Sequence, residues 1–213
     1  MASTVLIDYG SGNLRSAEKA LIRAASGLPG APQVTTSAEP EVVAAADRLV
    51  LPGVGAFAAC MAMIEARPGL REAIEETVRR RGRPFLGVCV GMQLVAERGL
   101  EFGETPGFGW IGGEVRRLEP GLPGLKVPHM GWNSLDSVVD HPVFAGLEGA
   151  DMYFTHSFAV HPADPADSAA FAVHGEHFTA AVARGNVAGV QFHPEKSQAR
   201  GLQLLGQFLE WRP

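Results

Sequence analysis

The run Gly-Val-Cys-Val-Gly at residues 87–91 constrains the fold more than any other stretch of this chain. It follows residues 83–86, Arg-Pro-Phe-Leu, which predict a short buried strand, and precedes residues 92–97, whose spacing predicts a helix. Glycines on both sides of Cys89 permit the sharp turn that such a junction needs. We therefore expect Cys89 at a nucleophile elbow, where the start of the helix favours the thiolate.

The residues before this junction alternate between strand and helix patterns. Strands are expected at residues 4–8, around Val34 and at 48–51, and helices at 14–25, 57–65 and 70–81. This alternation predicts a mostly parallel central sheet with helices on both faces. From about residue 109 the chain becomes β-rich, with strands expected at 114–118, 152–160, 169–174, 178–184 and 187–192, a hairpin corner at 184–186 and a closing helix at 198–211. We expect one α/β domain over residues 1–213, a length within the single-domain range.

Charge and cysteine usage limit the function classes. A net charge of −5 without a dense basic run argues against nucleic acid as the main partner. No segment is long enough to span a membrane, and the first residues lack a signal-peptide pattern. The only two cysteines, Cys60 and Cys89, suit a reducing compartment, so a cytoplasmic protein is expected, with Cys60 in a helix core.

Neither a cofactor nor a metal site is expected. Gly10-Ser11-Gly12 lacks the third glycine of a dinucleotide loop, because Arg15 stands there. The histidines of residues 174–177 match no zinc spacing, and a hairpin end is the simpler interpretation.

Residues 190–196, Val-Gln-Phe-His-Pro-Glu-Lys, supply a base for Cys89. Strand-like alternation would place His193 and Glu195 on one face. A thiol that attacks a carbonyl needs an imidazole to move its proton and an acceptor to orient that imidazole. The alternatives are an inert buried cysteine and a surface His–Glu pair.

Acyl transfer also needs two donors for the developing oxyanion. One is expected to be the amide of Val90, directly after the nucleophile. The other is expected from the loop after residues 48–51, which holds Gly53, Val54 and Gly55. Its alternative is a plain turn between strand and helix.

Together these motifs resemble the class I glutamine amidotransferases, which use a Cys-His-Glu triad on a flavodoxin-like single domain. Two further stretches narrow the resemblance: Asp-Tyr-Gly-Ser-Gly-Asn-Leu at 8–14 and Val-Pro-His-Met-Gly-Trp-Asn at 127–133. Both are similar to the glutaminase subunits of imidazole glycerol phosphate synthase in histidine biosynthesis.

This resemblance implies roles for individual residues. Cys89 would attack the side-chain amide of glutamine, His193 would carry protons and Glu195 would orient His193, with release of ammonia and glutamate. The residues implied to bind glutamine are Gln93, Glu101, His156, Ser157 and Phe158. Phe158 stands where relatives commonly carry tyrosine, and Val90 replaces a more usual leucine.

The motifs span nearly the whole chain and leave no obvious room for a site that would bind an acceptor of ammonia. We therefore expect a second protein to consume the ammonia. Resemblance implies a heterodimer with the cyclase subunit, a (β/α)8 barrel. Met130 and Trp132 are expected to anchor that interface, with core packing as the alternative. The resemblance implies that Asn13 and Lys196 also belong to this interface.

Two other function classes fit the residues. One is a non-catalytic subunit that keeps the pocket for a partner. The other is a cysteine peptidase or another amide hydrolase, which would prefer peptides to free glutamine.

Overall fold

Strands that are buried at every position form the centre of the molecule, in a computed structural model that describes residues 2–122 and 124–213. These strands are β3 (Arg48–Gly53), β4 (Phe85–Cys89) and β14 (Val187–Val190). Parallel strands covered on both faces carry such continuous apolar runs, because neither face meets water. Together with β1 (Ser3–Ile7) and β2 (Gln33–Ser37), they form the parallel half of the main sheet.

The β-rich second half extends this sheet with antiparallel strands. β13 (His177–Arg184), β12 (Ser168–Val173) and β9 (Ser137–Val138) complete eight strands in the order β2-β1-β3-β4-β14-β13-β12-β9. The expected corner at 184–186 joins β13 to β14, with Gly185 at a φ of 57°. The expected α/β fold class is confirmed, and the sheet itself is mixed rather than uniformly parallel.

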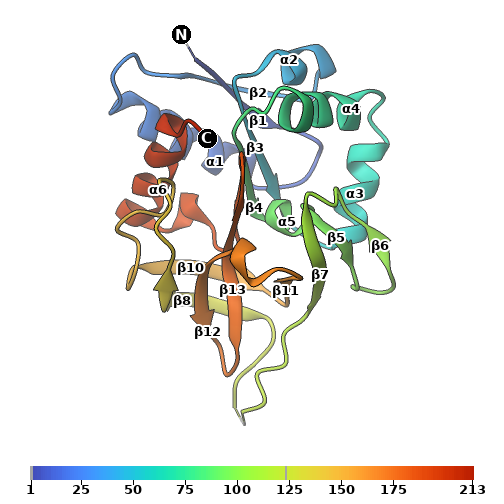
Figure 1. Ribbon diagram of the computed structural model, residues 1–213, viewed down its shortest axis with the longest axis vertical. Coiled ribbons are helices and arrows are strands. Elements are labelled where there is room, and N and C mark those ends of the chain that lie inside the picture. The colour runs from blue at the N-terminus through green and yellow to red at the C-terminus, as the bar shows by residue number, and fades with distance from the viewer. Residues whose placement is uncertain (1, 123) are drawn as a thin grey trace.

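Helices cover both faces of the parallel half (Figure 1). α1 (Leu14–Ser26) and α6 (Gln198–Glu210) lie on one face. On the other lie α2 (Pro40–Ala45), α3 (Phe57–Glu65) and α4 (Leu70–Glu75), which continues as a π-helical turn, Glu76–Arg80. Each buries apolar residues against the sheet, for example Leu21, Ile64 and Leu205.

Two smaller sheets stand beside the main one. The first pairs β10 (Asp151–His156) with β8 (His129–Ser134). The second has the order β11 (Phe158–Pro162), β7 (Ile111–Arg117), β5 (Ala96–Gly99) and β6 (Thr105–Pro106). Short 3-10 turns lie at Pro165–Asp167 and Pro194–Lys196.

The helix expected over residues 92–97 is wrong beyond its first residues. α5 spans only Val90–Gln93, and Ala96 already begins β5, where it pairs with Ile111 of β7. Leu94, Val95 and Ala96 are completely buried. A short apolar run fits a buried strand as well as a helix, and the pairing with β7 decided between them.

Two further expectations about strands need correction. The strand expected at 152–160 is broken at Ser157 into β10 and β11, which belong to different sheets. The last strand ends at Val190, so His193 and Glu195 lie in the turn beyond it and not on a strand face. β8 was not expected, because Gly131 and Asn133 weaken its β pattern.

Candidate active site

Cys89 ends β4 in a backbone conformation that side chains rarely adopt, with φ 56° and ψ −115°. Close packing around it explains the flanking glycines. A Cβ on Gly91 would lie 1.9 Å from the carbonyl oxygen of Leu51, and one on Gly87 would lie 2.4 Å from that of Gly91. Such strain is typical of a residue held for function, and the geometry is that of the expected elbow.

The turn after β14 brings His193 and Glu195 beside Cys89. His193 Nδ1 lies 3.0 Å from Glu195 Oε1, and both side chains are buried. Burial opposes the charged imidazolium, but hydrogen bonds to Cys89 and Glu195 and their negative charges raise the pKa of His193 to about 9. The imidazole is therefore held between sulfur and carboxylate and is protonated at neutral pH.

A cavity of about 280 Å³ opens in front of the Cys89 sulfur. Its lining brings together the residues that the resemblance implied for glutamine binding, namely Gln93, Glu101, His156, Ser157 and Phe158. Val54, Gly55, Val90, His193 and Lys196 also reach it. A cavity of this size suits a small polar molecule rather than an extended peptide.

The amide of Gln93 has a fixed orientation in this cavity. Its Nε2 donates to the carbonyl oxygen of Phe158 and to Gln191 Oε1, at 3.0 Å each. Gln191 Nε2 in turn lies 3.7 Å from Cys89 Sγ, as a donor toward the sulfur. Gln191 was not expected at the site, although its position two residues before His193 was a usable signal.

Glu101 has a structural contact as well as a place in the cavity lining. Its Oε2 accepts a hydrogen bond of 2.9 Å from the backbone amide of Phe57, the first residue of α3. A carboxylate at a helix N-terminus satisfies one of the amides that have no partner within the helix. This contact ties the cavity wall to α3.

The loop after β3 is held in place by α3 and by the loop after β1. The amide of Val54 donates to Ser11 Oγ at 3.1 Å. The Val54 carbonyl accepts from Ser11 Oγ at 2.7 Å and from Cys60 Sγ at 3.4 Å, and Cys60 is buried in α3 as expected. The Val54 N–H is therefore already bound to Ser11. The N–H of Val90 lies in the first turn of α5, where an amide has no partner within the helix and can serve as a donor.

Gly53 and Gly55 serve this loop in different ways. Gly53 packs against α5, since a Cβ there would lie 2.7 Å from the Gly91 nitrogen. Gly55 has a φ of 95° with open space around it, which leaves the loop free to turn.

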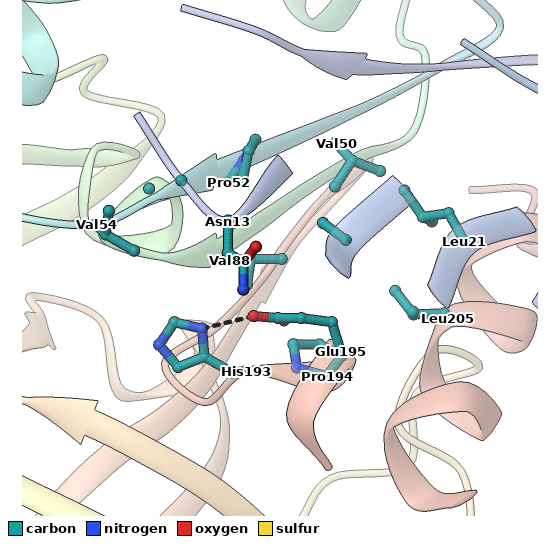
Figure 2. A pocket seen from close by; sticks show the side chains of 13 residues that line it. Asn13, Leu21, Val50, Pro52, Val54, Val88, His193, Pro194, Glu195 and Leu205 are labelled. Carbon is teal, nitrogen blue, oxygen red and sulfur yellow. Dashed lines mark hydrogen bonds and ion pairs between the residues drawn. The ribbon is translucent and has the colours of Figure 1, made fainter. Parts of the chain in front are cut away.

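Asn13 lies close to the His193–Glu195 pair. A cavity of about 20 Å³ beside Glu195 is lined by Asn13, Pro52 and Val88, among others. Figure 2 shows the Asn13 side chain pointing toward the imidazole and carboxylate. Asn13 is exposed, so it lies at the surface next to this pair.

Two of the other expected interface residues lie on the outer face of β8, and the third, Lys196, lies in the turn after β14. Met130 and Trp132 are 63% and 50% exposed, so the alternative of core packing is wrong for both. The Trp132 ring meets Tyr153 edge-on at 5.9 Å, and Lys196 Nζ lies 5.3 Å from the centre of the same tyrosine ring. Of these residues, Lys196 also lines the cavity in front of Cys89.

The described residues, 2–122 and 124–213, contain no group of three histidine, cysteine, aspartate or glutamate side chains placed to hold a metal ion. Within the same residues, no helix has the length and apolar character needed to cross a bilayer.

The fold and this site define the class of protein. Residues 5–210 match the family described as "Glutamine amidotransferase class-I", and the chain belongs to that family. Solved structures agree at the level of the fold: a glutamine amidotransferase superposes with a TM-score of 0.70 at 19% identity over 97% of each chain. Another, from Thermotoga maritima, has a TM-score of 0.64 at 15% identity over 98% of this chain and 96% of its own.

Full-length relatives narrow the family further. A protein of Caulobacter vibrioides named "Imidazole glycerol phosphate synthase subunit HisH" is 58% identical over 214 residues, which cover 100% of both chains. A protein of the same name from Cereibacter sphaeroides is 57% identical over 99% of both chains. Within the class I amidotransferases, the chain is a member of this HisH family.

Proposed function

We propose that this protein is the glutaminase subunit of imidazole glycerol phosphate synthase in histidine biosynthesis. It hydrolyses glutamine and passes ammonia to a cyclase subunit. The observation that carries the proposal is the strained Cys89 with the buried His193–Glu195 pair beside it, facing a cavity of about 280 Å³. Membership of the HisH family supports the pathway.

The first half of the reaction forms a thioester. The Cys89 thiolate attacks the side-chain amide carbon of glutamine, and the carbonyl oxygen becomes an oxyanion that the Val90 amide faces. His193 then gives its Nε2 proton to the leaving nitrogen, because Nδ1 is held by Glu195. The carbon–nitrogen bond breaks, ammonia leaves and Cys89 remains acylated.

The second half restores the enzyme. His193, now neutral, takes a proton from water as the water attacks the thioester carbonyl. Collapse of the second tetrahedral intermediate expels the Cys89 thiolate and leaves glutamate, so the net reaction consumes one water and one glutamine.

A second protein is needed to use the ammonia before it is protonated in water. The exposed surface of Met130, Trp132 and Lys196 next to the cavity is where we place the cyclase subunit. The cyclase would combine ammonia with its ribonucleotide substrate to give imidazole glycerol phosphate and an aminoimidazole carboxamide ribonucleotide. The free thiols of Cys60 and Cys89 suit the cytoplasm, where we place the complex.

The test is glutamate release from glutamine by the protein alone, and then with purified cyclase subunit and its nucleotide substrate. We expect a large rise in the complex. Cys89→Ala should abolish release while the circular dichroism spectrum and melting temperature remain those of a folded protein. Retained turnover in Cys89→Ala would rule out the mechanism, and faster hydrolysis of peptides than of glutamine would select the amide-hydrolase alternative.

A further inference from the structure

Two buried histidines, of which His156 lines the cavity, belong to one chain of hydrogen bonds. His129 and His156 face each other across the β8–β10 pair, and His129 Nδ1 lies 3.0 Å from His156 Nε2. His156 Nδ1 lies 2.9 Å from the carbonyl oxygen of Phe158. At the other end, Asn133 Nδ2 lies 3.3 Å from His129 Nε2.

The carbonyl oxygen of Phe158 shows where each proton in this chain lies. A carbonyl oxygen only accepts, so His156 must carry its proton on Nδ1, and its Nε2 must then accept. His129 must therefore donate from Nδ1 and accept on Nε2, where the Asn133 amide supplies a proton. The second proton of Asn133 Nδ2 goes to the carbonyl oxygen of Val173 at 2.8 Å.

Both imidazoles are neutral at physiological pH. Burial lowers the pKa of His129 to about 4, with a contribution from nearby His174. Burial also lowers the pKa of His156 to about 3, although its bond to Phe158 opposes the shift. An added proton on His156 would place two N–H groups against each other.

The chain ends on the group that orients Gln93. The Phe158 carbonyl accepts from both His156 Nδ1 and Gln93 Nε2, which uses both of its lone pairs. Gln93 Nε2 also donates to Gln191 Oε1, so both of its protons are used. Only Gln93 Oε1, an acceptor, is left to face a ligand in the cavity, and it selects a ligand group that bears N–H.

We propose that His129 is a positioning residue for glutamine, which holds His156 in the tautomer that fixes the Phe158 carbonyl and thereby the amide of Gln93. This inference rests on the proposed glutaminase function. If His156 instead carried its proton on Nε2, a lone pair would point at the Phe158 oxygen, and Gln93 would lose its fixed orientation. His129 thus acts through two other residues and touches no reacting atom.

Kinetics of matched variants test the role. His129→Leu removes the donor, whereas His129→Asn keeps an N–H close to the position of Nδ1. In the complex with the cyclase subunit, His129→Leu should raise the KM for glutamine about five- to tenfold with kcat changed less than about twofold, as expected for one buried hydrogen bond. His129→Asn should restore KM to within about twofold of wild type.

A control separates this role from packing. His174 stacks on His129 at 4.2 Å but donates elsewhere, to the carbonyl oxygen of Lys126. His174→Phe keeps the stack and should leave KM unchanged. Equal KM for His129→Leu and wild type, or equal losses in His129→Leu and His129→Asn, would overturn the proposal.

A measurement that needs no catalytic turnover tests the His129–His156 hydrogen-bond chain, called the relay below, separately from the glutaminase function. Long-range proton–nitrogen NMR spectra of the isolated protein should show the Nδ1–H tautomer for both His129 and His156. A proton on Nε2 of His156 would overturn the relay even if the complex were active. If wild-type complex released no glutamate, the glutaminase proposal would fail while the spectra still decided the tautomers.

Discussion

Cys89 has to be reactive while it is almost completely enclosed, and its neighbours meet both conditions. It is only 4% exposed, yet the Gln191 amide and His193 imidazole both direct donors toward its sulfur. A strained residue of this kind costs about 1–3 kcal/mol and persists only where its surroundings hold it. Here the close contacts of Gly87 and Gly91 hold it.

The pKa of His193 predicts the alkaline limit of activity. The folded pKa of about 9 lies above the ordinary value of 6.5, so the imidazolium is present at neutral pH and is lost as pH rises through about 9. The imidazolium contributes its full stabilisation of the fold below about pH 6.5. This stabilisation is lost as the pH rises from about 6.5 through about 9. Glutamate release by the complex should therefore fall above about pH 9.

Glu195→Gln should move this alkaline limit to lower pH, because it removes the negative charge that favours the imidazolium and leaves only a neutral acceptor for Nδ1. The pH profile of kcat/KM checks this shift, and the control is Glu114→Gln, which changes a half-buried carboxylate that pairs with Arg98. An unchanged limit in Glu195→Gln would assign the titration to another group.

Ser11 is predicted to restrain the oxyanion loop. Its hydroxyl accepts from the N–H of Val54 and donates to the Val54 carbonyl, so Ser11→Ala frees the Val54 N–H to turn toward Cys89. Loss of one oxyanion donor typically lowers the rate about 10²–10³-fold. We expect Ser11→Ala to recover part of this factor, so that glutamate release without the partner increases about three- to tenfold. Ser11→Thr keeps the hydroxyl and should behave as wild type; unchanged release in Ser11→Ala with an unchanged melting temperature would contradict the prediction.

At the scale of elements, the contact between β3 and α5 decides whether the elbow forms. α5 begins directly after Cys89, and Gly91 lies against the Leu51 carbonyl with no room for a methyl group. Gly91→Ala should lower the free energy of unfolding by about 3 kcal/mol, because the clash is with backbone that cannot move aside. Urea denaturation followed by circular dichroism measures it.

Gly206 provides the matched control for this prediction. It lies in α6, where a Cβ would meet no atom within 4 Å. Gly206→Ala should raise stability by about 0.5–1 kcal/mol, the usual gain from alanine in a helix interior. Similar effects of the two substitutions would show that the Gly91 contact is softer than its geometry indicates.

At the scale of the whole molecule, the small β8–β10 sheet links the exterior to the cavity. Its outer face exposes Met130 and Trp132, and its inner face holds His129 and His156. Figure 1 shows this sheet and the β12–β13 hairpin at the end of the molecule away from the N-terminus. Thr155 and His156 of β10 also line the cavity, so this sheet forms part of the cavity wall.

Trp132→Ala should weaken partner binding with little effect on the fold. A central aromatic residue at an interface is worth about 2 kcal/mol or more, so Kd should rise about thirtyfold. Half of Trp132 is already exposed, and its loss should lower stability by no more than about 1 kcal/mol. Calorimetric titration with the cyclase subunit and a melting curve measure the two effects.

The control for Trp132 is Phe102, which lies between β5 and β6 and is 95% exposed. Phe102→Ala should leave Kd and melting temperature unchanged. An unchanged Kd for Trp132→Ala with a strongly lowered melting temperature would place Trp132 in the fold rather than in the interface.

The sequence by itself determined the elements whose physics is local. Alternating strand and helix patterns predicted the parallel half of the sheet, and paired glycines predicted the elbow at Cys89. The motif around His193 and Glu195 indicated a base and its acceptor, although their proximity comes from a turn and not from the expected strand. Local spacing and backbone freedom were sufficient for these features.

Only the tertiary structure decided the features that depend on distant partners. The stretch Leu94–Ala96 is apolar enough for helix or strand, and pairing with β7 made it a strand. Three hydrogen-bonded contacts also join residues that are far apart in the chain. They are the bond from the Val54 amide to Ser11, the bond from Gln191 to the Cys89 sulfur and the bond between His129 and His156. Hydrogen-bond direction in a buried site follows from which acceptors the fold brings within reach, and no local pattern in the sequence carries that information.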